Sequence, residues 1–338
     1  NTEIMAASAN MATTVATVSS FIYIFLYYRT KRREIGQEIA ETVNYKPTRI
    51  RKTLKKIINV AIPISISSLI SSFGKNIDSF TIVRFLKNYL TEQEAKIQYG
   101  ILSGKIDSLC SLPFAFNVAF VTTLVPSISK SMAKGDLEEV AKKAEKYILI
   151  SILIAFPIAS TMFIYPNEIL KILFPNAPSG AMYLKISSIT IVFMLLAQTI
   201  NGVLQGIGKV NIPAISFGIG MIVKFLCNII LIPNKQIGIY GAIIGNILCN
   251  ILACIISSCV LIKNIKLKIN LKNLIIKPLL ATICINIISI VLYSNLKCIK
   301  SSNLAIIVTL MVSYLIYLIL IIIFRIYLPK KIKIKNFS

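Results

Sequence analysis

Charged side chains inside long apolar stretches are the residues of this sequence best suited to chemistry. Six of them stand in three stretches, SSFGKNIDSFTIVRFL, YGILSGKIDSLCSLP and GMIVKFLCN: Lys75, Asp78, Arg84, Lys105, Asp107 and Lys224. An ionisable group in a membrane is costly unless it faces a wet cavity or a partner, so such residues are functional candidates. Most of the six are cationic, which suits an anionic group such as a diphosphate.

We therefore predict two roles for these residues. The predicted contacts to an anionic substrate are Lys75, Arg84, Lys105 and Lys224. Lysine would bind as a point charge, whereas the fork of Arg84 could bind two oxygens at once. Asp78 and Asp107 are predicted to couple to an ion or to pair with a neighbouring cation. Because the two longer stretches lie towards the outer ends of an antiparallel helix pair, they could converge on one polar patch.

A simpler interpretation of the same residues stays open. Lys75 and Asp78 stand three residues apart and could form a local ion pair on one helix. The lysines could also lie near helix ends and extend their charged groups to the interface, which is called snorkelling. Lys224 is a stronger candidate because it lies nine residues before Pro233 among apolar neighbours, but snorkelling remains an alternative there too.

Other kinds of chemistry find little support in the sequence. It has no histidine, the usual general base and commonest metal ligand, so no catalytic residue, metal site or cofactor is predicted. The seven cysteines form no CxxC pair and lie mostly in apolar runs, as small core side chains do. The glycines of NGVLQGIGKVNIP follow an apolar run rather than a strand, so this segment is interpreted as a tight turn and not a phosphate loop.

The composition assigns this chain to the membrane. It is 56% hydrophobic with a mean hydropathy of +0.76, too apolar for a soluble domain of 338 residues. The net charge of +24 comes from short basic clusters between apolar runs. A nucleic-acid-binding face needs a soluble scaffold, so the basic clusters indicate membrane lipids as partners and no nucleic acid.

An all-α, polytopic membrane protein of about nine transmembrane helices is therefore expected, since spanning needs about 20 apolar residues. The predicted spans are Met5–Tyr28, Ile57–Phe85, Gly100–Ile128, Tyr147–Tyr165, Met182–Leu204, Ile212–Ile232, Ile239–Leu261, Leu279–Tyr293 and Leu304–Tyr327. Between the third and fourth, Asp136 is predicted to cap a short interfacial helix. Prolines at 63, 113, 126 and 157 predict bent or broken helices.

The loops alternate in positive charge, which predicts the orientation. The richer side, expected in the cytoplasm, holds residues 29–56, 130–146, Lys209, 263–272 and the tail from Lys330. The C-terminus is therefore expected inside and Asn1 outside. Because Asn1 is not Met and no signal peptide is evident, we expect a chain truncated at its N-terminus.

Four segments are familiar: AIPISISSLISSFGKNIDSFTIVRFL, GILSGKIDSLCSLPFAFNVAFVTTLVPSISKSMAKGD, INGVLQGIGKVNIPA and GIYGAIIGNILCNILA. They resemble the polysaccharide flippase branch of the multidrug/oligosaccharidyl-lipid/polysaccharide exporter superfamily. The nearest group is stage V sporulation protein B, with lipid II flippases as relatives. LVPSISKSMAKGD and LQGIGK are the more specific pieces.

The resemblance implies fourteen helices, arranged as two six-helix lobes around a cavity plus a final pair. Matched to this chain, it implies the last helix of the first lobe at 1–28, a basic cytoplasmic loop at 29–56, the second lobe at 57–262, and the extra pair with its tail at 263–338. Five helices of the family pattern would then be missing, so any activity would belong to the full-length protein.

Three functions are weighed. The leading one is a flippase that moves an undecaprenyl-diphosphate-linked sugar or peptidoglycan precursor such as lipid II across the bacterial cytoplasmic membrane, for cell-wall or spore-cortex synthesis. The alternative is a multidrug cation antiporter of the same superfamily, for which only Asp78 and Asp107 supply carboxylates here. A membrane enzyme would usually show a larger outer loop than 86–99 or 166–181.

Overall fold

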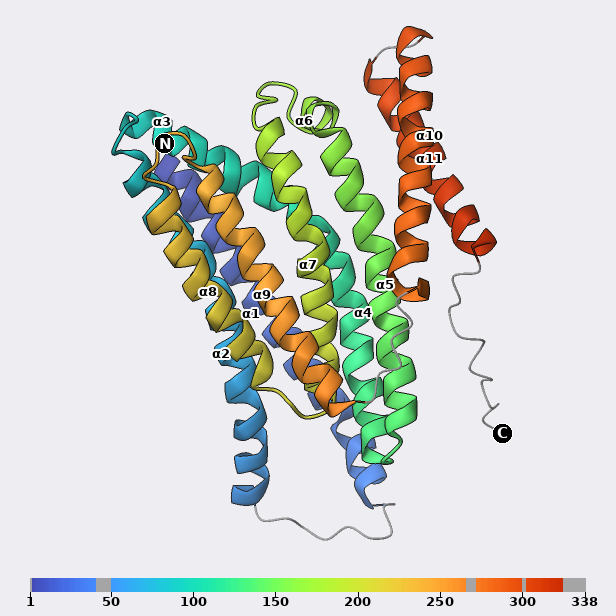
Figure 1. The fold of residues 1–338 in the computed structure, drawn as a ribbon. Helices are drawn as coiled ribbons and strands as arrows, with labels where there is room; N and C mark the ends of the chain where they lie inside the picture. The colour runs from blue at the N-terminus through green and yellow to red at the C-terminus, as the bar shows by residue number, and fades with distance from the viewer. Residues whose placement is uncertain (1, 41–49, 266–271, 300–301, 325–338) are drawn as a thin grey trace. The chain divides into compact units, whose positions relative to one another are not determined.

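The structure, a computed structural model, describes residues 2–40, 50–265, 272–299 and 302–324. The described residues form helices and no strand. In chain order these are α1 (Thr2–Ala40), α2 (Ile50–Leu86), α3 (Glu92–Gly100), η1 (Ile101–Ile106), α4 (Asp107–Ala133), α5 (Leu137–Ile164), α6 (Pro166–Leu173), α7 (Ala181–Gly206), α8 (Ile212–Leu231), α9 (Tyr240–Asn264), η2 (Lys272–Ile276), α10 (Lys277–Ile299) and α11 (Ser302–Ile323). Figure 1 shows their course.

The chain divides into two units, Asn1–Asn59 and Val60–Ser338, with the boundary inside α2. The first unit contains α1 and the basic first turns of α2. The apolar side chains that the structure describes in α1 are exposed, as at Phe21 and Tyr23. The second unit contains the rest of α2 and every later helix, and it holds the buried core.

Seven helices of the described part are long and apolar enough to cross a membrane. They correspond to the third to ninth predicted spans, so the prediction of a polytopic helical membrane protein is confirmed. The first two predicted spans, Met5–Tyr28 and Ile57–Phe85, lie within α1 and α2, which contain side chains outside the described part. Leu279–Tyr293, the shortest predicted span, is the centre of the longer α10.

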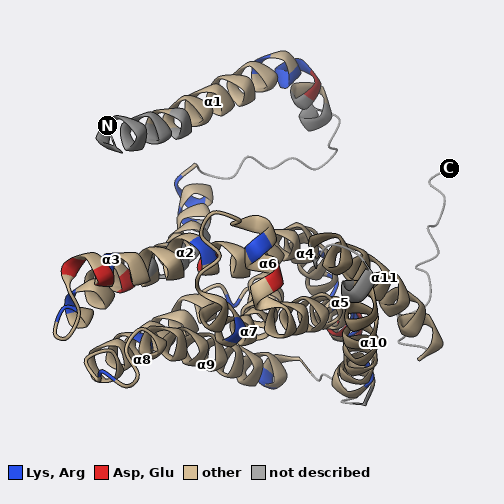
Figure 2. Ribbon diagram, turned by 90° about the horizontal axis from the view of Figure 1, so that it is seen from above, with Lys and Arg blue, Asp and Glu red and all other residues tan. Residues whose placement is uncertain are grey.

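Small residues let the helices of the second unit approach closely, as is usual in membrane bundles. A Cβ atom at Gly202 of α7 would lie 2.6 Å from Val121 of α4. A Cβ at Gly220 of α8 would lie 2.8 Å from the carbonyl oxygen of Cys249 in α9. Figures 1 and 2 both show α8 and α9 side by side. These helix pairs therefore need glycine because a methyl group has no room.

Polar side chains also connect the helices in the core. Asn117 of α4, which is fully buried, donates to Thr199 of α7 over 3.0 Å and accepts from Ser151 of α5 over 3.0 Å. Ser257 of α9 donates to Asn201 of α7 over 2.8 Å. Such bonds satisfy groups that lipid could not, and they fix the register of neighbouring helices.

The segment from Glu92 to Ala133 is one continuous helical run of 42 residues. It starts at a capping box in which Thr91 accepts from the backbone of Glu94, so helix replaces most of the outer loop predicted before Gly100. The run includes a π-helical turn, Ile101–Ile106, and continues through Pro113 and Pro126. Pro113 and Pro126 therefore do not break this helix, and the π-turn, which contains Lys105, is a separate feature that the prolines did not predict.

The start of α5 corrects one prediction. Asp136 is the N-cap, as predicted, and accepts from the Glu139 amide over 2.8 Å. The prediction of a separate interfacial helix, however, was wrong, because Leu137–Ile164 is one helix. Val140 and Ala144 in its first turns are fully buried in the same core as the later turns. Because these first turns pack in the core, the helix continues without interruption into the membrane span.

The last two helices pack beside α5, and hydroxyl groups line that contact. Tyr165 donates to Ser289 of α10 over 3.0 Å, and Tyr317 of α11 donates to the carbonyl of Leu153 over 3.1 Å. Seen from above in Figure 2, the ribbon of the second unit is mostly uncharged, with acidic turns on α3. One ion pair, Lys224 of α8 with Asp78 of α2, joins two of these helices and forms the candidate site.

Candidate functional site

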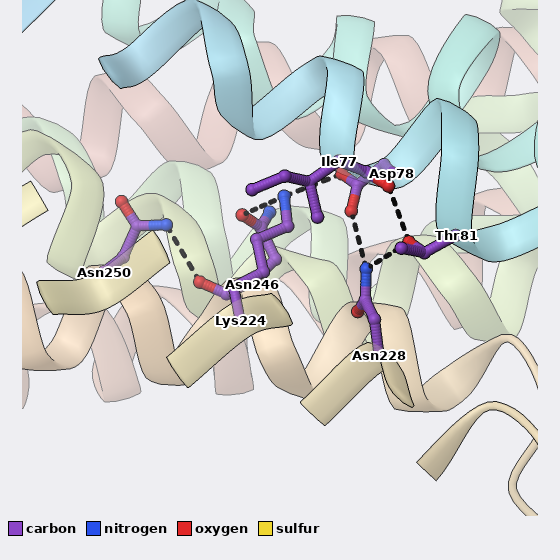
Figure 3. A network of polar contacts seen from close by, with 7 residues as sticks. All are labelled: Ile77, Asp78, Thr81, Lys224, Asn228, Asn246 and Asn250. Carbon is purple, nitrogen blue, oxygen red and sulfur yellow. Dashed lines mark hydrogen bonds and ion pairs between the residues drawn. The ribbon is translucent and has the colours of Figure 1, made fainter. Parts of the chain in front are cut away.

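A buried ion pair joins α2 to α8. The Lys224 Nζ atom of α8 lies 2.6 Å from Asp78 Oδ2 of α2 (Figure 3). The Lys224 side chain is 6% exposed and that of Asp78 is 16% exposed. Two charges withdrawn from solvent in this way stay stable only when each satisfies the other. The pair therefore fixes the two helices to each other at this depth.

An amide and a hydroxyl complete the α2 side of the site. Asn228 Nδ2 donates to Asp78 Oδ1 over 3.1 Å and to Thr81 Oγ1 over 2.9 Å. Thr81 in turn donates to the carbonyl of Ile77 over 2.6 Å. Lys224 and Asn228 lie four residues apart on α8, so they share one face of that helix. Both oxygens of the Asp78 carboxylate are thus bonded to α8.

Helix α9 contributes a weaker contact. Lys224 Nζ lies 3.5 Å from Asn246 Oδ1, at the outer limit for a hydrogen bond. Asn250 donates to the backbone carbonyl of Asn246 over 2.9 Å, one helical turn along (Figure 3). The ammonium therefore lies where α2, α8 and α9 meet, with its short bond directed to α2.

Glycines surround this site on all three helices. A Cβ at Gly74 of α2 would lie 2.4 Å from the Met221 methyl group of α8. A Cβ at Gly245 of α9 would lie 3.3 Å from Asn228 Oδ1. The helices approach closely enough for short polar side chains such as Asp78 and Asn228 to bridge them.

The remaining predicted residues lie elsewhere. Lys105 donates to the carbonyl of Ala177 over 2.6 Å, in the loop between α6 and α7, and its Nζ lies 5.5 Å from the centre of the Phe174 ring. The side chain of Arg84 is exposed, and Asp107 begins α4 half-buried. The side chain of Lys75 lies outside the described part of the structure.

Two alternatives from the sequence are changed by this geometry. Asp78 pairs with Lys224 on another helix, 146 residues away, while the predicted local pairing with Lys75 lies outside the described side chains. Lys224 does not snorkel, because only 5% of the residue is exposed and its ammonium points to Asp78. Lys224 and Asp78 lie on different helices, so the packing of α2 against α8 fixes the geometry of their ion pair.

Sequence reasoning missed Thr81, Asn228 and Asn246. A signal was present, because Asn228 follows Lys224 by four residues and Asn250 follows Asn246 by four, in runs that are otherwise apolar. Polar residues at helical spacing inside a membrane span indicate a face that contacts another helix rather than lipid. What the spacing does not give is which helix that face contacts.

A bundle of apolar helices with a charged, hydrogen-bonded junction inside it defines the class of this chain, a multi-pass helical membrane protein. The MatE family model matches residues 103–230, from η1 to the last turn of α8. The chain is 29% identical to the uncharacterized membrane protein YabM of Bacillus subtilis over 70% of its length, and 22% identical to stage V sporulation protein B of the same organism over 96%. The match covers 43% and 62% of those two proteins, so the chain spans about half the length of these relatives.

A solved structure has the same fold. The lipid II flippase MurJ, in an inward closed conformation, superimposes with a TM-score of 0.57 at 16% identity, over 85% of this chain and 58% of that one. Residues 103–230 therefore resemble the MatE family, and the chain is similar in sequence to stage V sporulation protein B and, at 23% identity over 71% of its length, to the lipid II flippase MurJ of Bacillus subtilis. The predicted resemblance is thereby confirmed.

Proposed function

We propose that the full-length protein is a flippase that moves an undecaprenyl-diphosphate-linked sugar or peptidoglycan precursor across the bacterial cytoplasmic membrane. One relative supports transport as the activity, since it is named a lipid II flippase, and another is named stage V sporulation protein B. The observation that carries the proposal is Lys224, a cation buried inside a membrane bundle and held at 2.6 Å by a carboxylate of another helix. Such a residue is costly to keep there without a role.

The substrate contacts proposed from the sequence take different places in this picture. Arg84 is exposed on α2 and is free to meet an anionic headgroup. Lys224 reaches substrate only if its contact to Asp78 opens. Lys105, on its π-turn, contacts the α6–α7 loop, so we assign it to the closing of that end of the bundle. Lys75 remains a proposed contact on the basis of its sequence position alone.

The proposed organisation follows the family pattern. Residues 1–28 end the first lobe, 29–56 form a cytoplasmic loop, 57–262 form the second lobe, and 263–338 form an extra helix pair with a cytoplasmic tail. Alternating access would proceed by rocking of the two lobes about a site between them. The partners are then the lipid-linked sugar or lipid II and the surrounding membrane lipids.

Cation antiport is the alternative function, and the burial of the Asp78 carboxylate between two helices supports it. A buried carboxylate that joins two helices is a plausible coupling group if a transported cation displaces Lys224 from it. In that case loss of Asp78 would abolish transport while loss of Arg84 would not. The two functions are therefore separated by which charge is essential.

The test is translocation of a lipid-linked precursor in intact cells that lack their own flippase and express the full-length protein. Precursor in the outer leaflet is measured with a membrane-impermeant label, and membrane abundance is measured in parallel. We expect Arg84→Glu to abolish translocation and Arg84→Lys to reduce it moderately, because the charge survives without the bidentate fork. Lys209→Gln, at an exposed turn, is the control.

The outcome is informative in either direction. Normal translocation by Arg84→Glu, together with loss on replacing Asp78 and Asp107 alone, would reject the flippase in favour of cation coupling. No outer-leaflet precursor with the wild-type protein at normal abundance would reject transport of this substrate class.

A further inference from the structure

The ammonium of Lys224 has bonding capacity left over. A lysine ammonium carries three N–H donors. Among the residues that the structure describes, the acceptors within reach are Asp78 Oδ2 at 2.6 Å and Asn246 Oδ1 at 3.5 Å, and the second is at the limit. One strong bond and one long bond leave the ammonium able to donate to a further anionic oxygen without first losing all its contacts.

Asp78 is held in a different way. Its second oxygen accepts from Asn228 over 3.1 Å, and Asn228 is itself anchored by Thr81 over 2.9 Å. These contacts do not involve Lys224. If the ammonium moves away, the carboxylate keeps its hydrogen bond from Asn228, which also lies on α8. The pair is therefore asymmetric, with a firmly held anion and a cation on a flexible four-carbon stem.

We propose that Lys224 and Asp78 form an exchangeable ion pair, in which an anionic oxygen of a diphosphate takes the Lys224 ammonium from Asp78. The exchange removes the shortest polar contact between α2 and α8 and so loosens the two helices, which the bonds of Asn228 still connect. This proposal rests on the flippase function above and concerns how that site is regulated. In the empty site Asp78 is the internal substitute for the anion. When the diphosphate is present it competes for the same donor, and the short contact between the two helices opens.

The physical chemistry favours a switch rather than a gradual change. Opening the pair with no incoming anion leaves a buried ammonium and a buried carboxylate without an opposite charge, so the empty site stays closed. A diphosphate oxygen offers the ammonium a charge-assisted bond of the same kind that it gives up. Because only a ligand with a different affinity for the two states can shift their populations, the exchange makes the diphosphate, and not the lipid tail, the group that opens the contact.

The experiment uses the purified full-length protein with farnesyl diphosphate as the probe and farnesol as the uncharged control. Binding is measured together with the distance between spin labels at Phe80→Cys and Ile222→Cys, two exposed positions on α2 and α8, in a cysteine-free background. For the otherwise unchanged protein we expect farnesyl diphosphate, and not farnesol, to lengthen this distance.

Three variants separate exchange from simple cohesion. Asp78→Asn removes the competing anion and should bind farnesyl diphosphate about tenfold more tightly, with a lengthened distance even without ligand. Lys224→Gln should bind at least tenfold more weakly. The double variant Asp78→Leu with Lys224→Met keeps an apolar contact that commonly folds as well as a buried ion pair. It should remain folded and closed. The distance between its spin labels should not change when farnesyl diphosphate is added, and its binding should not distinguish farnesyl diphosphate from farnesol.

The results that would overturn the exchange are specific. If Asp78→Asn weakens binding as much as Lys224→Gln, the pair serves cohesion only. If the double variant transports normally, no exchange is required. Either result with normal wild-type translocation rejects the exchange and leaves the flippase function standing, whereas absence of wild-type translocation rejects the function itself.

Discussion

Replacing Asn117 by leucine should destabilise the bundle measurably, because this side chain joins three helices. Its amide nitrogen donates to the Leu195 carbonyl over 3.2 Å, to Gln198 Oε1 over 2.8 Å and to Thr199 Oγ1 over 3.0 Å. Its oxygen accepts from Ser151 over 3.0 Å. Leucine has a similar volume and none of these groups.

The magnitude follows from the number and setting of these bonds. The two N–H donors of the Asn117 amide are shared among three acceptors, so with the bond that its oxygen accepts the side chain makes about three full bonds. Interhelical hydrogen bonds in membrane proteins contribute on average about 0.6 kcal/mol each, so these contribute about 2 kcal/mol. Part of the loss is recovered, because Ser151 and Thr199 also lie 2.6 Å from each other and keep that bond. We therefore expect Asn117→Leu to lower the free energy of unfolding by about 2 kcal/mol.

The assay is reversible unfolding of the purified full-length protein in mixed micelles, followed by circular dichroism. Asn211→Leu is the matched control, since Asn211 is exposed at the start of α8 and its side chain makes no capping bond. A double-mutant cycle with Ser151→Ala should give a coupling between the two residues. A change for Asn117→Leu no larger than that of Asn211→Leu would refute the argument that this cluster holds α4, α5 and α7 together.

Two further predictions concern packing and topology. Gly220→Val should destabilise the protein by about 1–3 kcal/mol, because a Cβ there would lie 2.8 Å from the Cys249 carbonyl oxygen, and unchanged thermal stability would contradict the close contact of α8 and α9. Single cysteines at Arg32 and Lys297 in a cysteine-free background should be labelled from inside and outside respectively, and strong external labelling at 32 with none at 297 would reverse the proposed orientation.

The spans were predictable because they depend on composition and length alone. About 20 apolar residues in a row have few stable arrangements other than a transmembrane helix. The Asp136 cap was predictable for the same reason, since a cap depends on neighbours three residues away. The position at which a helix begins or ends depends less on nearby residues and more on tertiary packing. Val140 and Ala144 are buried against the bundle, and that packing carries α5 through a stretch whose charges suggested a separate element.

The partner of Asp78 could not be predicted in this way. Within the sequence, Lys75 is three residues from Asp78 and offers the obvious local pair. Lys224 is 146 residues away and competes only after α2 and α8 have come together through Gly74 and Met221. The glycines that permit this approach carry no charge signal. The pairing is thus a property of helix packing, which a single sequence specifies only indirectly.

The same point changes how the charge of the site should be counted. Adding up charged residues along the sequence gives a positive cluster, and that sum was the reason to expect an anion. In the folded protein Lys224 is already neutralised by Asp78 at 2.6 Å, so its charge becomes available only when that contact opens. Arg84, which is exposed, has no such precondition. An anionic substrate would therefore meet Arg84 first and would then take Lys224 from Asp78, which orders the two contacts in the proposed cycle.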